Sequence, residues 1–198
     1  PAPGSARRPA PATLLCQSLP IAGTLAETYL RGRGITCPLP KSLRFHPNCW
    51  HGLTAKRYPA MIAAVQGNQL AAVHRTYLKA DGSGKADIEP AKMMLGATKR
   101  AAVRLSEGRE RLVVSEGIET ALSLSSGLLS APAGVWAALS TSGMRGLALP
   151  SQAGHLTIAS DGEQAGREAA NALAARANDL GWQVTLLPAP DGLDWNDV

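Results

Sequence analysis

Aromatic residues are scarce in this sequence of 198 residues, where Phe, Trp and Tyr together make up 4%. Base stacking on aromatic side chains is a main source of affinity in many proteins that bind single-stranded nucleic acid, so we expect stacking to contribute little here. No apolar run approaches the roughly 18 residues that a membrane-spanning helix needs, and the sequence does not open on a signal-peptide pattern. We therefore expect a cytoplasmic protein that makes no membrane contact.

Cysteine is also rare, and the three residues Cys16, Cys37 and Cys49 are too few and odd in number for a disulfide framework. We expect reduced thiols, as is usual for a cytosolic protein. Cys37, His46, Cys49 and His51 could in principle bind zinc, but they lack the paired short spacings of structural zinc sites, and prolines interrupt them. We therefore expect no zinc site.

Lysine is absent from the second half of the chain. Residues 1–108 carry 15 Lys and Arg against 5 Asp and Glu, whereas residues 109–198 carry 5 against 10. A basic half beside an acidic half suggests that the first attracts a polyanion while the second gathers metal ions. The alternative is that the basic surface only aids solubility.

The remaining composition is that of a folded protein, with 45% hydrophobic and 18% charged residues. The length suits one large or two small domains. We expect a flexible Pro/Ala-rich linker over residues 1–18, a basic α+β domain over residues 19–108 and an α/β domain over residues 109–198. Because the chain starts at Pro1 and not at Met, we also expect either a piece of a longer protein or a processed one.

The first half shows a helix and a hairpin. Apolar residues spaced at three and four predict a helix over residues 19–32, starting near Thr24. Two apolar runs, residues 58–65 and 70–78, predict strands joined by a turn at residues 66–68. We therefore expect this domain to be antiparallel.

The second half alternates strands and helices. Short apolar runs at residues 112–115, 135–139, 156–159 and 184–187 predict buried strands, and residues 164–180 predict a long helix. Right-handed crossovers between such strands make the sheet mostly parallel, with helices on both faces. The expected fold is therefore Rossmann-like.

Three acidic residues follow two of these strands. Glu116 comes directly after residues 112–115, and Asp161 and Glu163 follow residues 156–159. The ends of parallel strands meet at one edge of a sheet, where ligands bind, so we expect the three side chains to lie together. Two negative charges about 4 Å apart repel by roughly 1 kcal/mol in water and about 4 kcal/mol at an effective dielectric near 20, and a divalent cation removes that conflict.

Oxygen ligands without His or Cys favour Mg²⁺ or Mn²⁺ over zinc. The chemistry that such ions support is phosphoryl transfer, in which the metal holds the attacking and leaving oxygens. The alternative for each single acid is a helix cap or a solvated surface position, and Asp161 before Gly162 suits a cap.

Basic residues surround a glycine-rich turn in the first half. Arg75 lies on the strand before the turn at residues 81–84, Lys79 and Lys85 flank the turn, and Lys92 follows. Such turns let backbone N–H groups approach phosphate, and the cations supply opposing charge. The alternative is a hairpin tip with solvated lysines.

Four segments of the second half resemble, in order, the motifs of a toprim domain: residues 116–122, 138–143, 160–167 and 194–197. The match is most similar to the toprim domains of DnaG-type bacterial primases and of the primases carried by plasmids and phages. This resemblance implies that Glu116 acts as a general acid/base or metal ligand, that Asp161 and Glu163 bind Mg²⁺, and that Asp194 is a further metal ligand. The second acid of the pair is normally Asp, and Asn196 is an amide where the family often has a carboxylate.

The resemblance also implies an activity, namely a DNA primase-like catalytic core that synthesises short RNA primers on single-stranded DNA. The basic segment is similar to the part that precedes toprim in these primases, where Lys and Arg face the template and the nucleoside triphosphates. Arg75, Lys79, Lys85 and Lys92 are therefore candidates for nucleic-acid or nucleotide binding. A helicase is a further candidate partner, and Mg²⁺ or Mn²⁺ the expected cofactor.

Two other functions stay open. A toprim domain can belong to a nuclease or a topoisomerase, but a topoisomerase needs a nucleophilic tyrosine, and Tyr29, Tyr58 and Tyr77 lie in no supporting context. The residues that depart from the family, Glu163 and Asn196, also allow a noncatalytic nucleic-acid-binding module with a degenerate metal site.

Overall fold

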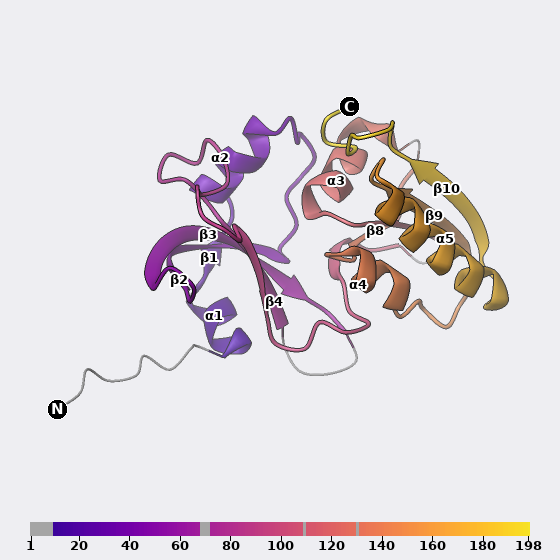
Figure 1. The fold of residues 1–198 in the computed structure, drawn as a ribbon, viewed down its shortest axis with the longest axis horizontal. Helices are drawn as coiled ribbons and strands as arrows, with labels where there is room; N and C mark the ends of the chain where they lie inside the picture. Colours follow the sequence, from indigo (N-terminus) through magenta and orange to yellow (C-terminus); the bar gives the residue numbers. More distant parts are fainter. Residues whose placement is uncertain (1–9, 68–71, 109, 130) are drawn as a thin grey trace.

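A computed structural model describes residues 10–67, 72–108, 110–129 and 131–198. The chain forms two five-stranded sheets that lie side by side, each with its own helices (Figure 1). The first part contains α1 (Pro11–Gln17), β1 (Leu19–Pro20), α2 (Leu25–Gly32), β2 (Leu43–His51), β3 (Lys56–Val65), β4 (Ala72–Tyr77) and β5 (Lys92–Leu95). The second part contains β6 (Val103–Ser106), β7 (Arg111–Ser115), α3 (Ile118–Ser123), the π-helical turn η1 (Leu124–Leu128), β8 (Gly134–Ala137), α4 (Thr141–Gly146), β9 (His155–Ser160), α5 (Gln164–Asp179) and β10 (Gln183–Pro188). Within the described ranges, no helix is both long and apolar enough to cross a membrane.

The first sheet is antiparallel throughout, in the order β1-β2-β3-β4-β5. The expected hairpin is confirmed, because β3 and β4 pair antiparallel with Ile62 opposite Arg75. Residues 68–71 lie outside the described residues. They include the last residue of the expected turn at 66–68 and the first two residues of the expected strand 70–78. The helix α2 begins after Thr24, the expected start, whereas Leu19–Pro20, inside the range expected for the helix, form strand β1 instead.

The linker expected over residues 1–18 is wrong for residues 11–17, which form helix α1. Pro11 occupies the first helical position, where proline needs no N–H partner and its fixed φ suits a helix. Leu14 is buried and packs into the core on one face of the first sheet. One apolar anchor is therefore enough to dock a segment whose composition resembles a linker. Residues 1–9 lie outside the described residues.

The second sheet has the order β10-β9-β7-β8-β6. Its first four strands are parallel and β6 pairs antiparallel with β8, so the expected mostly parallel sheet is confirmed. Strand β6, which precedes the division expected after residue 108, pairs with β8 of the second sheet. Val103 and Leu105 of β6 are buried in the core.

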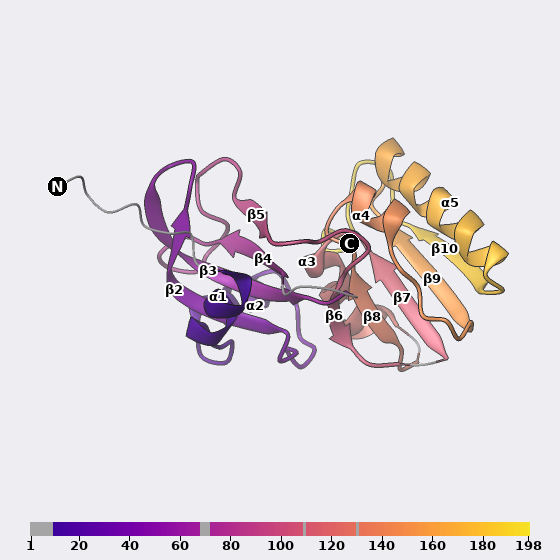
Figure 2. The same cartoon turned by 90° about the horizontal axis from the view of Figure 1, so that it is seen from below.

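Both faces of the second sheet are covered, as expected. Because side chains alternate along a strand, Val114 faces helices α4 and α5 while Val113 faces α3 and the first part of the chain. Figure 2 shows α4 and α5 along one side of the sheet. The other side merges with the core of the first part.

One hydrophobic core joins the two parts. It contains Tyr29 and Leu30 of α2 together with Ile118 and Leu122 of α3, and it extends under both sheets. The amide of Asn196 ties the C-terminal segment to both helices, donating to the Arg33 carbonyl oxygen at 2.8 Å and to Ser123 Oγ at 2.7 Å. These two hydrogen bonds join the C-terminal segment to the ends of α2 and α3.

Candidate active site

Two acidic side chains lie at one edge of the second sheet. Strand β7 ends at Ser115 and β9 ends at Ser160, and because these strands are parallel neighbours, the residues that follow them emerge together. Glu116 and Asp161 line one cavity of about 190 Å³. Asp194, from the segment after β10, lines it as well.

The opposite wall of this cavity comes from the first part of the chain and is basic. Its residues are Arg33 after α2, His74 of β4, Lys85 after the glycine-rich turn and Lys92 of β5. A cavity with carboxylates on one wall and cations on the other suits a ligand that carries both metal ions and phosphates.

Two carboxyl groups of this cavity, Glu116 and Asp161, have raised pKa values. The pKa of Asp161 is raised to about 6, first by burial and then by the charges of Asp194 and Glu163. Burial, followed by the charges of Asp161 and Glu163, also raises the pKa of Glu116. The Oδ1 atom of Asp161 is buried without a hydrogen-bond partner.

These features fit a hard divalent cation. Such an ion would relieve the repulsion between the carboxylates and satisfy the orphaned Asp161 oxygen, and ligands that are all oxygen favour Mg²⁺ or Mn²⁺. In the described part of the chain, no three His, Cys, Asp or Glu side chains already converge as a metal cage. Mg²⁺ commonly binds through one or two carboxylates and completes its shell with water and phosphate oxygens, so two of the carboxylates that line this cavity could hold such an ion.

Glu163 lies outside the cavity lining. It is the residue that precedes the first turn of α5, and its side chain is exposed. Its charge still raises the pKa of Glu116 and of Asp161. The structure thus brings Glu116, Asp161 and Asp194 together and leaves Glu163 beside them.

Glu119 links the two walls of the cavity. It is only 5% exposed, accepts a hydrogen bond from Tyr29 Oη at 2.8 Å, and pairs with Lys92 Nζ at 3.0 Å. Burial alone would raise the pKa of Glu119, but the charge of Lys92 and hydrogen bonds from its own backbone, Lys92 and Tyr29 outweigh burial and lower that pKa to about 2. Glu119 therefore stays ionised and holds Lys92 in place beside the other carboxylates.

His74 lies in the basic wall and is 5% exposed. Burial, and then the charge of Lys92, lower the pKa of His74 to about 4, so the ring is neutral near pH 7. Its Nδ1 atom has no hydrogen-bond partner. A neutral imidazole with a free nitrogen can accept or donate one hydrogen bond to a ligand, depending on its tautomer.

Two of the four basic candidates reach the cavity. Lys92 and Lys85 line it, and loss of solvent around Lys85 together with the charge of Lys92 lowers the pKa of the Lys85 amine. Lys79 pairs with Asp87 at 3.3 Å and does not line the cavity. Arg75 is 8% exposed and lies on the opposite face of β4 from His74.

Sequence reasoning missed Glu119 and His74. Glu119 lies inside the segment 116–122 that resembles a toprim motif, yet its partners Tyr29 and Lys92 are 90 and 27 residues away along the chain. No local spacing reveals such a network. The one available signal for His74 was strand alternation, which places it opposite to Arg75.

Comparison with known proteins identifies both halves. Residues 5–105 match the family model of a domain of unknown function, DUF7146. Residues 111–198 match the model of the toprim domain. Among curated proteins, none matches the sequence of this chain significantly.

Three solved primase structures share the fold. A DNA primase domain from Pseudomonas aeruginosa is 21% identical, with 90% of this chain and 68% of that chain covered and a TM-score of 0.51. The RNA polymerase domain of the Mycobacterium tuberculosis primase DnaG is 17% identical, with 87% and 70% covered and a TM-score of 0.51. The Aquifex aeolicus primase, with its zinc-binding and RNA polymerase domains, is 15% identical, with 89% and 52% covered and a TM-score of 0.50.

These similarities confirm the resemblance read from the four motifs, and they extend the shared fold to the first half of the chain. At such identities the solved structures establish the fold alone. The chain belongs to the DUF7146 family through its first half, and its second half is a toprim domain arranged as in the primases.

Proposed function

We propose that this protein is a DNA primase-like nucleotidyl transferase that joins nucleoside triphosphates into short RNA primers on single-stranded DNA. The observation that carries the proposal is the cavity in which Glu116, Asp161 and Asp194 face Lys85 and Lys92. A nucleoside triphosphate bound with Mg²⁺ needs carboxylates for the metal and cations for the phosphates. Both are present on facing walls.

The residues divide the work by position. Asp161 and Asp194 would hold Mg²⁺ or Mn²⁺, which when bound neutralises and orients the phosphates. Lys85 and Lys92 contact the triphosphate. The raised pKa of Glu116 makes its carboxylate a better base near neutral pH, so Glu116 takes the proton of the attacking 3′-hydroxyl as pyrophosphate leaves.

The two parts of the chain have separate roles in this proposal. The basic part, residues 19–108, holds the template strand and the nucleotides, and the toprim part, residues 109–198, holds the metal. Six lysines in the first part and none in the second support that division. A helicase as partner and a cytoplasmic location belong to the same proposal.

Primer synthesis is the decisive test. The wild type is incubated with single-stranded DNA, labelled nucleoside triphosphates and Mg²⁺, beside Glu116→Gln and Asp161→Asn. We expect each variant to lose about 100-fold or more of the activity, which for Glu116→Gln is the order of magnitude of a lost acid/base group, while the melting temperature is not lowered. Glu168→Gln, an exposed carboxylate on α5 paired with Arg145, is the matched control and stays active.

Full activity in Glu116→Gln or Asp161→Asn overturns the assignment. A reaction without nucleotides separates the alternatives, because shorter DNA products under those conditions indicate a nuclease. Absence of both reactions, with Mg²⁺ binding that Asp161→Asn does not change, indicates a noncatalytic binding module.

A further inference from the structure

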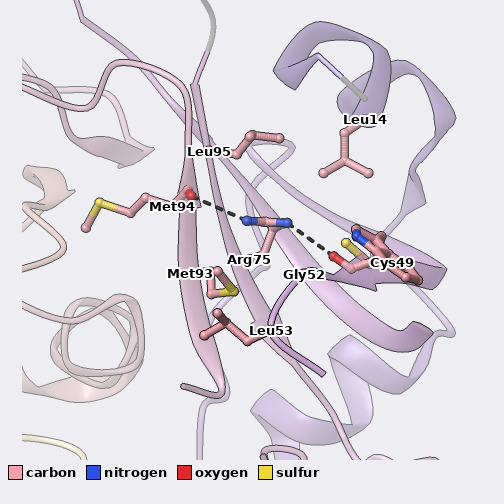
Figure 3. Close-up of a pocket in the computed structure, with 9 residues that line it drawn as sticks. Leu14, Cys49, Gly52, Leu53, Arg75, Met93, Met94 and Leu95 are labelled. Carbon is pink, nitrogen blue, oxygen red and sulfur yellow. Dashed lines mark hydrogen bonds between the residues drawn. The ribbon is translucent and has the colours of Figure 1, made fainter. Parts of the chain in front are cut away.

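Arg75 points away from the site just described. Because side chains alternate along a strand, His74 faces the cavity between the two parts while Arg75 faces the far side of the first sheet. There Arg75 lines a second cavity of about 100 Å³ (Figure 3). Leu14 of α1 closes one side of it, and Met93, Met94 and Leu95 of β5 form another.

The guanidinium of Arg75 is buried and under-bonded. Its Nη1 and Nη2 atoms each donate one hydrogen bond, to the carbonyl oxygens of Trp50 and Met94, and both are long at 3.3 Å. Its Nε atom has no partner. Arginine offers five N–H donors, so three remain unused in a side chain that is 8% exposed.

No acid of the chain neutralises this charge. All 15 Asp and Glu residues lie within the described residues, and none of the ion pairs involves Arg75. The Tyr77 ring lies 5.7 Å from the guanidinium carbon and supplies only a weak cation–π contact. Arginine cannot lose its proton at such a site, and an unpaired buried charge is costly. The site is therefore short of one negative charge.

The walls define what else a ligand must be. Six of the nine lining residues are Leu, Met or Trp. One apolar side chain of the wall, Leu53, is 70% exposed to solvent. Met94 lines the cavity through its backbone, because it pairs with His74 and its side chain points to the other face of the sheet. A ligand that satisfies both features has an anionic end for Arg75 and a small apolar body for these side chains.

We infer that the Arg75 cavity binds a carboxylate carried on a small apolar group. A carboxylate is planar and accepts two parallel N–H bonds from a guanidinium, and its single charge matches the single charge of Arg75. A phosphate dianion would leave excess charge against apolar walls, which is unfavourable. The carboxylate belongs either to a free short-chain aliphatic acid or to an apolar C-terminal residue of a polypeptide.

Binding is measured by isothermal titration calorimetry on the wild type, without nucleic acid or metal, so that the result is independent of primer synthesis. Butyrate tests the free acid, and N-acetyl-glycyl-leucine with a free carboxylate tests the polypeptide terminus. Butyramide, the amidated peptide and inorganic phosphate are the controls. We expect one of the two carboxylates to bind at least tenfold more tightly than its neutral amide and than phosphate, and the tighter of the two identifies the source.

Two variants locate the binding. Arg75→Met replaces the arginine with an uncharged side chain of similar length. We expect this variant to bind the carboxylate at least tenfold more weakly than the wild type. Arg111→Met, at an exposed position on β7 of the other sheet, keeps the wild-type affinity. Equal binding of carboxylate and amide, tighter binding of phosphate, or equal affinity in Arg75→Met overturns the inference. The ligand comparisons use the wild type, so the test remains valid even if Arg75→Met does not fold.

Thermal unfolding gives a second readout. A structural arginine lowers the melting temperature when replaced, because its two carbonyl contacts are lost. If Arg75 serves a ligand, the Arg75→Met variant should melt at the same temperature as the ligand-free wild type or higher. The reason is that the substitution removes an unpaired buried charge. We expect the second result, and the wild-type comparison of carboxylate with amide decides the inference if Arg75→Met unfolds at a lower temperature.

Discussion

The pKa of Asp161 shows how burial and neighbouring carboxylates act on a single residue of the candidate site. Its pKa is raised from 3.8 to about 6, so the folded protein without metal favours the protonated form. The stability that this protonation contributes is complete below pH 4 and is lost as pH rises through about 6. If Asp161 binds Mg²⁺ as proposed, metal binding displaces that proton, and we expect the affinity for Mg²⁺ to fall at low pH.

We expect Asp161→Asn to be more stable than the wild type at pH 8 in the absence of metal. The gain is about 1–2 kcal/mol, which is the pKa shift converted to free energy and reduced for partial solvent screening. At pH 4 the two proteins should differ little, because Asp161 is then neutral. Urea unfolding in EDTA at both pH values measures the difference, and equal stability at pH 8 contradicts the raised pKa.

Glu119 has the opposite electrostatic role, because its pKa is lowered to about 2. Its ionised form stabilises the fold above pH 4.5, and that contribution is lost as pH falls toward 2. We expect Glu119→Gln to lower the free energy of unfolding at pH 7 by about 1–3 kcal/mol, since it leaves Lys92 without its buried partner. Urea titration measures this loss.

A second readout separates positioning of Lys92 from general stability. If Glu119 holds Lys92 for a ligand, Glu119→Gln raises the KM for nucleoside triphosphate more than it lowers kcat. An unchanged KM in folded Glu119→Gln would indicate that the Glu119–Lys92 pair has only a structural role.

Among single residues, the sequence predicted that Glu116 and Asp161 lie together, because the ends of parallel strands meet at one edge of a sheet. Both residues line one cavity in the structure, and their roles stay a prediction. The same reasoning could not place Arg75. Alternation shows that His74 and Arg75 face opposite sides of β4, but not which side carries the site. That choice depends on how the second part docks, which no local pattern encodes.

Among the elements, helix α3 has the most consequential position. It starts directly after Glu116 and Gly117, carries Glu119, and packs into the core that it shares with α2. Leu122 on this helix is 1% exposed. A short helix thus supports the acidic wall and contacts the basic part at once.

We expect Leu122→Ala to destabilise the protein by about 2–5 kcal/mol, as buried Leu to Ala changes commonly do. Both parts should lose stability together, because Leu122 lies in the core that they share. Hydrogen exchange in β3 and in β9 measures the two parts separately. Two independent transitions, with only the toprim part destabilised, would contradict a shared core.

The elements that sequence predicted well are those with strong periodicity, namely α2, the β3–β4 hairpin, α5 and the parallel strands. The failures were short or depended on partners far along the chain. Helix α1 has only one buried anchor, Leu14, inside a Pro/Ala-rich segment. Strand β6 lies after the basic segment, but pairing with β8 assigns it to the other sheet.

At the scale of the whole molecule, the first part of the chain supplies the cationic wall of the cavity and the second part supplies the wall with the carboxylates. We expect single-stranded DNA binding to depend on salt, with each lost phosphate contact reducing the slope by about 0.7. Lys85→Ala combined with Lys92→Ala should reduce the slope of log affinity against log salt by about 1.4.

The matched control removes two exposed lysines that do not line the cavity, Lys41 and Lys99, and changes the net charge by the same amount. Its slope should stay close to that of the wild type. An equal reduction in both double variants would mean that DNA responds to overall charge and not to the cavity.

The common interior beneath α2 and α3 also limits how such proteins can be rearranged. A toprim half grafted from a distant relative would have a surface shaped for a different α2. The graft would leave voids and clashes in the core that Tyr29 and Leu30 now share with Ile118 and Leu122. Successful chimeras should therefore require the two helices to be transplanted as a matched pair.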